Sequence, residues 1–155
     1  VQCFDTSVPA GAQLVRFQLF NTDTSAPADL DLEVFAGPGG VGASVGSSGG
    51  STSNEVVTLT TPAAGTYSAC VTGFNAGAAG VTYTLSSWVV GPAAGAQSLK
   101  ASAPRSVYTG GSASVALGWS VPTGHRYMGL VTYFDTRVPA SPVNLGSSIV
   151  LVDNR

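Results

Sequence analysis

Charged side chains are scarce in this chain: Asp, Glu, Lys and Arg make up 9% of its 155 residues, against about a quarter in ordinary soluble proteins. The few Lys and Arg residues form no basic cluster with interleaved aromatics, which argues against a nucleic-acid partner. No run approaches the roughly 20 apolar residues that a membrane span needs. A signal peptide and an initial Met are both lacking, so we expect a mature or excised piece of a longer secreted precursor.

Catalytic side chains are equally scarce. The chain has a single histidine, His125, which would need an acid such as Asp135 and an activated serine to form a hydrolytic triad. No GxSxG elbow is present. The acidic residues crowd onto one expected strand, whereas glycosidase chemistry needs two carboxylates facing each other across a sugar. These absences predict that the chain is not an enzyme.

Cysteine is limited to Cys3 and Cys70. Neither lies in a CxxC pair, so zinc and thioredoxin-type chemistry are not expected. We predict a Cys3–Cys70 disulfide, which would stabilise the fold by roughly 4 kcal/mol on the chain-entropy model. Two buried free thiols are the alternative.

A sustained helical period is also missing, and Gly or Pro recurs every few residues. Runs rich in Val, Thr, Tyr, Phe and Leu are separated by turn residues instead, which is typical of strands. We expect strands near 2–6, 12–20, 29–36, 54–60, 65–73, 80–89, 97–102, 105–109, 112–120, 126–134 and 147–153. The Gly/Ser-rich segment 37–53 is predicted to be a flexible loop. The pattern predicts an all-β protein, with an antiparallel sandwich or jelly roll followed by a small Ig-like or fibronectin-like sandwich.

Two units are expected, covering residues 1–90 and 97–155, because the Gly/Ala/Pro segment 90–96 has the composition of a linker. The charge also changes there. Residues 1–90 hold six acids and one base, whereas residues 91–155 hold two acids and five bases. This asymmetry favours two units that attract each other.

An acidic row stands out in the segment 29–34. Asp29, Asp31 and Glu33 alternate with apolar residues, so in a strand the carboxylates share one face. Calcium prefers carboxylate and carbonyl oxygens, and these three residues are our candidate calcium ligands. A solvated acidic face, or Asp29 capping a turn, are the alternatives.

Aromatic side chains offer a second kind of site. Trp88, Trp119 and Tyr127 are candidates for stacking against a sugar or a peptide. Both tryptophans lie in alternating strands, so packing in a core or between the units is the alternative.

Five elements follow one another along the chain: VPAG at 8–11, the expected strand with Arg16 and Phe17, DLDLEV at 29–34, SNE at 53–55 and PAAGTY at 62–67. In this order and spacing, the segment 5–90 resembles the bacterial pre-peptidase C-terminal domain. Residues 97–155, with RYMGLVTY at 126–133 and SIVLVD at 148–153, are similar to the short Ig-like tail that follows such a domain in secreted subtilisin-like serine proteases.

The resemblance implies a secreted, non-catalytic C-terminal accessory region of a bacterial subtilisin-like protease. Its expected role is to bind protein or polymeric substrate, or to assist secretion and maturation. Its expected partner is that substrate or the catalytic domain. Collagenase collagen-binding domains are similar modules, some of which bind calcium, but this chain lacks the acidic N-terminal linker that those use. The alternative is an extracellular structural subunit, such as a surface, adhesin or filament protein, whose copies assemble through strand edges.

Overall fold

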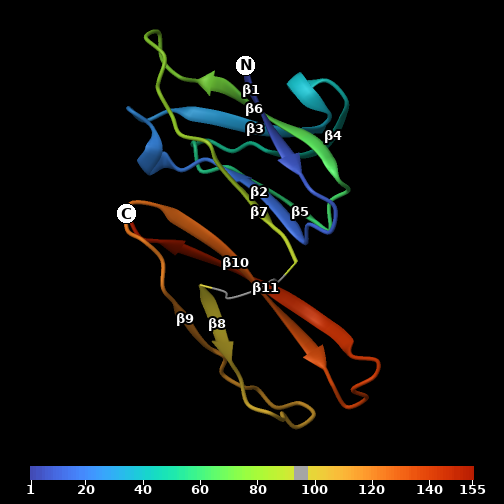
Figure 1. Ribbon diagram of the computed structural model, residues 1–155. Coiled ribbons are helices and arrows are strands. Elements are labelled where there is room, and N and C mark those ends of the chain that lie inside the picture. Colours follow the sequence, from blue (N-terminus) through green and yellow to red (C-terminus); the bar gives the residue numbers. More distant parts are fainter. Residues whose placement is uncertain (93–97) are drawn as a thin grey trace. The chain divides into compact units, whose positions relative to one another are not determined.

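The computed structural model describes residues 1–92 and 98–155, and the chain divides into two compact units, Val1–Pro92 and Ala93–Arg155 (Figure 1). Most of the predicted linker at 90–96 lies outside the described residues.

Antiparallel strands account for nearly all of the regular structure, which confirms the all-β prediction. The strands of the first unit are β1 (Gln2–Val8), β2 (Leu14–Gln18), β3 (Asp29–Ala36), β4 (Ala43–Ser48), β5 (Val56–Thr60), β6 (Gly65–Asn75) and β7 (Ser86–Val90). Those of the second unit are β8 (Leu99–Ser102), β9 (Ala116–Trp119), β10 (Arg126–Asp135) and β11 (Val143–Asp153). Two short 3-10 turns, η1 (Asn21–Asp23) and η2 (Pro38–Gly40), complete the first unit. Among the described residues, no helix has the length and apolar character that crossing a membrane would require.

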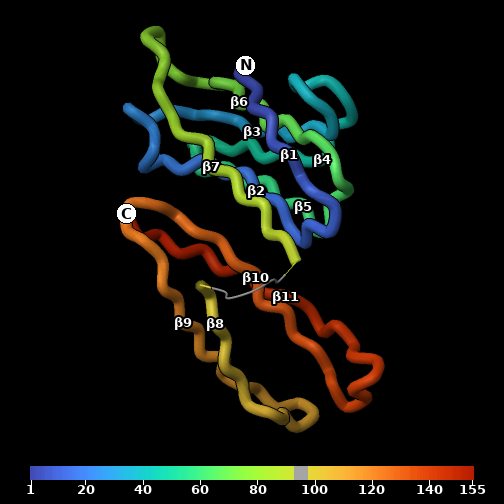
Figure 2. Tube along the Cα trace, viewed as in Figure 1, coloured from blue at the N-terminus to red at the C-terminus, as the bar shows by residue number. Residues whose placement is uncertain are grey.

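The first unit is a sandwich of two sheets. One sheet has the strand order β1-β6-β3-β4 and the other has the order β5-β2-β7 (Figure 2). The core between them joins Val15 and Phe17 of β2 to Leu32 and Val34 of β3, all of which are at most 1% exposed. Burial of side chains of this size contributes roughly 1.5–3 kcal/mol each, so these contacts hold the two sheets together.

Strand β3 follows the predicted alternation. Leu30, Leu32 and Val34 are buried. Of the acidic residues that alternate with them, Asp29 and Asp31 are half-buried and Glu33 is exposed. Because successive side chains of a strand point to opposite faces, the acidic row lies on the outer face of the four-stranded sheet.

The prediction of a flexible loop at 37–53 was wrong, because β4 forms inside this segment and pairs with β3. Small residues are required there by the packing. A Cβ atom on Gly46 would lie 2.7 Å from the Val57 side chain of the facing sheet. The absence of a side chain at Gly46 therefore allows the close approach of β4 to β5.

Three other predicted strands were too long or absent. No strand forms at 105–109, the strand expected at 112–120 shortens to β9, and the one at 80–89 shortens to β7. Around 105–109 the chain makes a turn in which Gly111 N donates to Tyr108 O, and Tyr108 is 93% exposed. Apolar side chains in this stretch thus have no sheet to pack against.

The second unit contains two two-stranded sheets, β8-β9 and β10-β11. The two sheets meet where Leu99 of β8 lies against Gly129 of β10. A Cβ atom on Gly129 would be 2.4 Å from the Leu99 side chain. None of residues 98–155 is fully buried. The Ig-like assignment of this unit stays a prediction.

Candidate functional site

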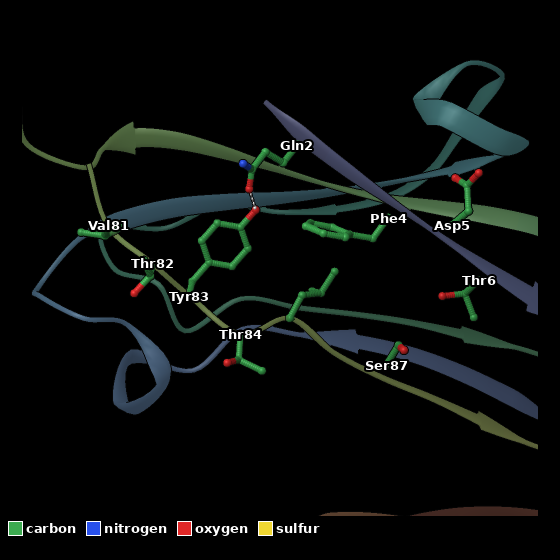
Figure 3. Close-up of a pocket in the computed structure, with 10 residues that line it drawn as sticks. Gln2, Phe4, Asp5, Thr6, Val81, Thr82, Tyr83, Thr84 and Ser87 are labelled. Carbon is green, nitrogen blue, oxygen red and sulfur yellow. Dashed lines mark hydrogen bonds between the residues drawn. The ribbon is translucent and has the colours of Figure 1, made fainter. Parts of the chain in front are cut away.

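The two sides of the first sandwich differ. On one side β4 and the start of β5 are tied together, because the Ser48 hydroxyl donates to the Glu55 carboxylate and accepts from Val56 N at 3.2 Å. On the other side β1 ends one sheet and β7 ends the other. Between β1 and the segment leading into β7 lies a hollow of about 570 Å³, which we call the β1 groove (Figure 3). Its lining residues are Gln2, Phe4, Asp5, Thr6, Val81, Thr82, Tyr83, Thr84, Leu85 and Ser87.

An aromatic pair forms the apolar part of the β1 groove. Phe4 points from β1 toward Tyr83, and the two rings meet edge to face with centroids 6.4 Å apart (Figure 3). Phe4 faces the interior side of its sheet yet is 44% exposed. The exposed part of the ring lines the hollow and is available to another molecule.

A polar pair lies beside the rings. The Tyr83 hydroxyl donates to Gln2 Oε1 at 2.7 Å (Figure 3). Burial raises the pKa of Tyr83, because the charged phenolate is disfavoured away from water. The carbonyl oxygen of Gln2 is thereby engaged, while its amide nitrogen has no hydrogen-bond partner in the described part of the chain. The groove thus combines an exposed ring with a free neutral donor.

Strand β1 is fixed to β6 by side-chain bonds as well as by its ladder. The carboxylate of Asp5 accepts hydrogen bonds from Ser68 Oγ at 2.5 Å and from Gly39 N at 2.9 Å. The bond from Ser68, and next the bond from Gly39, lower the pKa of Asp5, because both donors favour the charged form. Asp5 points away from the groove toward the η2 turn (Figure 3).

The predicted disulfide is confirmed: Cys3 of β1 and Cys70 of β6 are directly opposite and bonded. Cys70 lies on the outer side of β6, as its alternation with Tyr67 and Ala69 predicts, but it is only 4% exposed. The η2 turn explains this burial. A Cβ atom on Gly40 would stand 2.7 Å from both sulfur atoms, so the turn lies directly on the disulfide.

The proposed calcium ligands lie on the outer face of β3. Asp31 and Glu33 line a shallow hollow together with Phe74, which is 76% exposed. Asp29 has one carboxylate oxygen that is buried without a hydrogen-bond partner. Within residues 1–92 and 98–155, no three His, Cys, Asp or Glu side chains are grouped as a metal site requires. Calcium binding by these residues stays a prediction.

The proposed stacking aromatics lie on separate strands. Trp88 of β7 is opposite Arg16 on the outer face of the three-stranded sheet, where Arg16 Nε donates to Thr58 Oγ1 at 2.8 Å. Trp119 of β9 is 53% exposed. Tyr127 of β10 contacts His125 edge to face, with ring centroids 6.2 Å apart. Their role in binding stays a prediction.

Sequence reasoning missed the β1 groove. Gln2 and Phe4 lie in a segment correctly predicted to be a strand, but the sequence does not reveal that this strand ends a sheet. Tyr83 joins them only through the fold, because it is 81 residues from Gln2. The available signal was the alternation of Gln2, Phe4 and Thr6 with Cys3 and Asp5, which separates the two faces of the strand.

No curated protein and no solved structure matches this chain. One family model matches the N-terminal part of the chain, which holds β1 and most of β6. Tyr83 and the segment that leads into β7 lie outside the match. Residues 1–73 match the family model of the bacterial pre-peptidase C-terminal domain.

Proposed function

We propose that this chain is a non-catalytic C-terminal accessory region of a secreted bacterial subtilisin-like serine protease, and that its first unit binds the polypeptide substrate of that enzyme. Pre-peptidase C-terminal domains are non-catalytic and are associated with the C-terminal regions of secreted proteases. A role in secretion and maturation fits the family equally well. The β1 groove favours binding, because secretion alone needs no exposed aromatic pocket.

The observation that carries this proposal is the β1 groove itself. Phe4 offers an exposed ring and Gln2 offers a free amide donor, while apolar, tyrosine, threonine and serine side chains line the rest. The only charged lining residue, Asp5, directs its carboxylate away from the hollow toward Ser68 and Gly39. Such a site suits the uncharged backbone and apolar side chains of a polymer better than a small ion.

The test is co-sedimentation of the 155-residue chain with insoluble collagen, keratin, chitin and cellulose, each with and without calcium. Binding to a protein polymer is expected, and Phe4→Ala should weaken it. The matched control is Phe74→Ala, which removes an exposed ring of the same type from the outer face of β6. If neither protein polymer is bound, or if both variants lose binding equally, the proposal fails.

Assembly into a surface structure is the second candidate. It is favoured by the strand edges of the first unit, since β1 and β7 each end a sheet and an unpaired edge is a template for another strand. Sizing and electron microscopy of the purified chain test this alternative. Ordered oligomers or filaments would support it, and a strict monomer at high concentration would exclude it.

A further inference from the structure

We propose that the outer edge of β1 takes up an extended polypeptide segment as an additional strand, with an apolar side chain in the β1 groove and a basic side chain beside Asp5. This inference rests on the proposed function, because it names the form in which a substrate polypeptide is held. Its test is separate, since it uses soluble peptides and reads out backbone pairing.

The direction of the β1 backbone groups follows from the disulfide. The Cα atoms of Cys3 and Cys70 are 4.0 Å apart, which is the short spacing of an antiparallel pair that exchanges no backbone hydrogen bonds. The N–H and C=O of Cys3 therefore point away from β6. Because this pattern repeats every second residue, the same holds for Asp5 and Ser7, which are opposite Ser68 and Thr66.

These outward groups form an unpaired ladder. Strand β1 pairs only with β6, and no backbone hydrogen bond outside the strand ladders involves Cys3, Asp5 or Ser7 in the described part of the chain. The ladder offers three donors and three acceptors in alternation. Only a polypeptide has backbone donors and acceptors that recur at every second residue with the same spacing, so the chemistry of the edge selects a polypeptide over a glycan.

The side chains of the added strand fall on two faces. Residues directly opposite Cys3, Asp5 and Ser7 share the outer face with these side chains, whereas the residue opposite Phe4 lies on the inner face. On the inner side it meets the hollow between Phe4, Tyr83 and Leu85. An apolar side chain at this position would cover the Phe4 ring.

The charge of Asp5 and of the first unit determines which side chains of the added strand are favoured on the outer face. The carboxylate of Asp5 stays ionised because Ser68 and Gly39 donate to it. The residue of the added strand that pairs with Asp5 would therefore have this negative charge beside its side chain. The first unit also carries six acids and one base, so a basic segment is attracted and an acidic one is repelled. A second copy of the chain is disfavoured, since antiparallel pairing of two β1 strands about their centre would bring the two Asp5 residues together.

The probe is an acetylated and amidated octapeptide in which lysine and valine alternate, added to the full chain at low salt and followed by fluorescence anisotropy. Two N-methylated versions separate backbone pairing from composition. Methylation of the lysine amides removes the donors that face β1 and should weaken binding about tenfold or more. Methylation of the valine amides affects only the outward side and should leave binding within about twofold, because those donors face water.

Protein variants complete the test. Phe4→Ala should weaken binding of the unmethylated peptide, whereas Phe74→Ala should not, and thermal melting confirms that both variants fold. A glutamate–valine peptide should bind more weakly than the lysine–valine peptide. If the lysine–valine peptide does not bind, or if both methylated versions bind alike, edge pairing is wrong. Should insoluble protein polymers still be bound in that case, the proposed function survives while this inference does not.

Discussion

Gly46 of β4 lies against Val57 of β5, so closely that a Cβ atom on Gly46 would be 2.7 Å from Val57 Cγ1. This contact closes one side of the first sandwich. On the opposite side, Phe4 and Gln2 of β1 contact Tyr83 of the segment leading into β7, and the β1 groove lies there. The candidate binding site therefore lies on the side of the sandwich opposite the contact between Gly46 and Val57.

Gly46→Ala should therefore destabilise the chain by about 1–3 kcal/mol, because the added methyl group overpacks the core. Urea denaturation followed by tryptophan fluorescence measures the change. Gly91→Ala is the control, since a Cβ atom there meets nothing within 4 Å. Adding Val57→Ala to Gly46→Ala should recover part of the loss. Equal stability of the Gly46 variant and the control would contradict the close contact.

Removal of the disulfide with Cys3→Ala and Cys70→Ala together should cost roughly 4 kcal/mol, because the bridge closes a long loop in the unfolded chain. The sequence separation of the two cysteines is 67 residues. Denaturation of the wild type with and without a reductant gives the same comparison. The double variant should not respond to the reductant. A wild-type midpoint that is insensitive to reduction would overturn the prediction.

Acid should weaken the attachment of β1 to β6, because protonation of Asp5 removes the charge that accepts the hydrogen bond from Ser68. The pKa of Asp5 in the folded chain is lowered from 3.8 by its bonds from Ser68 and Gly39. Its contribution to stability is therefore present above pH 3.8 and is lost as the pH falls through the lower folded value. Asp5→Asn should be less stable than the wild type at neutral pH, and the difference should shrink in acid.

Thermal melting between neutral and acidic pH measures this dependence. Glu33→Gln is the matched control, because the Glu33 side chain is exposed and its carboxylate has no hydrogen-bond partner among the described residues. A constant difference between wild type and Asp5→Asn across the whole pH range would show that the carboxylate charge is not involved.

The two faces of β3 should respond differently to truncation. Leu32→Ala removes a side chain that is 1% exposed and should cost about 2–5 kcal/mol. Glu33→Ala, at the next position on the outer face, should change stability by less than about 0.5 kcal/mol. Denaturation midpoints of the two variants test the alternation directly, and similar losses for both would contradict it.

The sequence predicted β3 well because its alternation is strict, and it predicted the disulfide because only two cysteines are present. It did not predict β4, since Gly46 is small for a reason that lies in the facing sheet at Val57. The β1 groove was missed for a similar reason. Which strand ends a sheet depends on the order of all the strands, and no local pattern at Phe4 reveals it.

Amide exchange along β1 tests the central claim most directly. In the free chain the outward amides of Cys3, Asp5 and Ser7 should exchange quickly, whereas the alternate amides, which pair with β6, should exchange slowly. At saturating lysine–valine octapeptide the outward amides should slow by about tenfold or more. Unchanged exchange of these three amides would contradict the account that β1 is the edge on which this chain binds polypeptide.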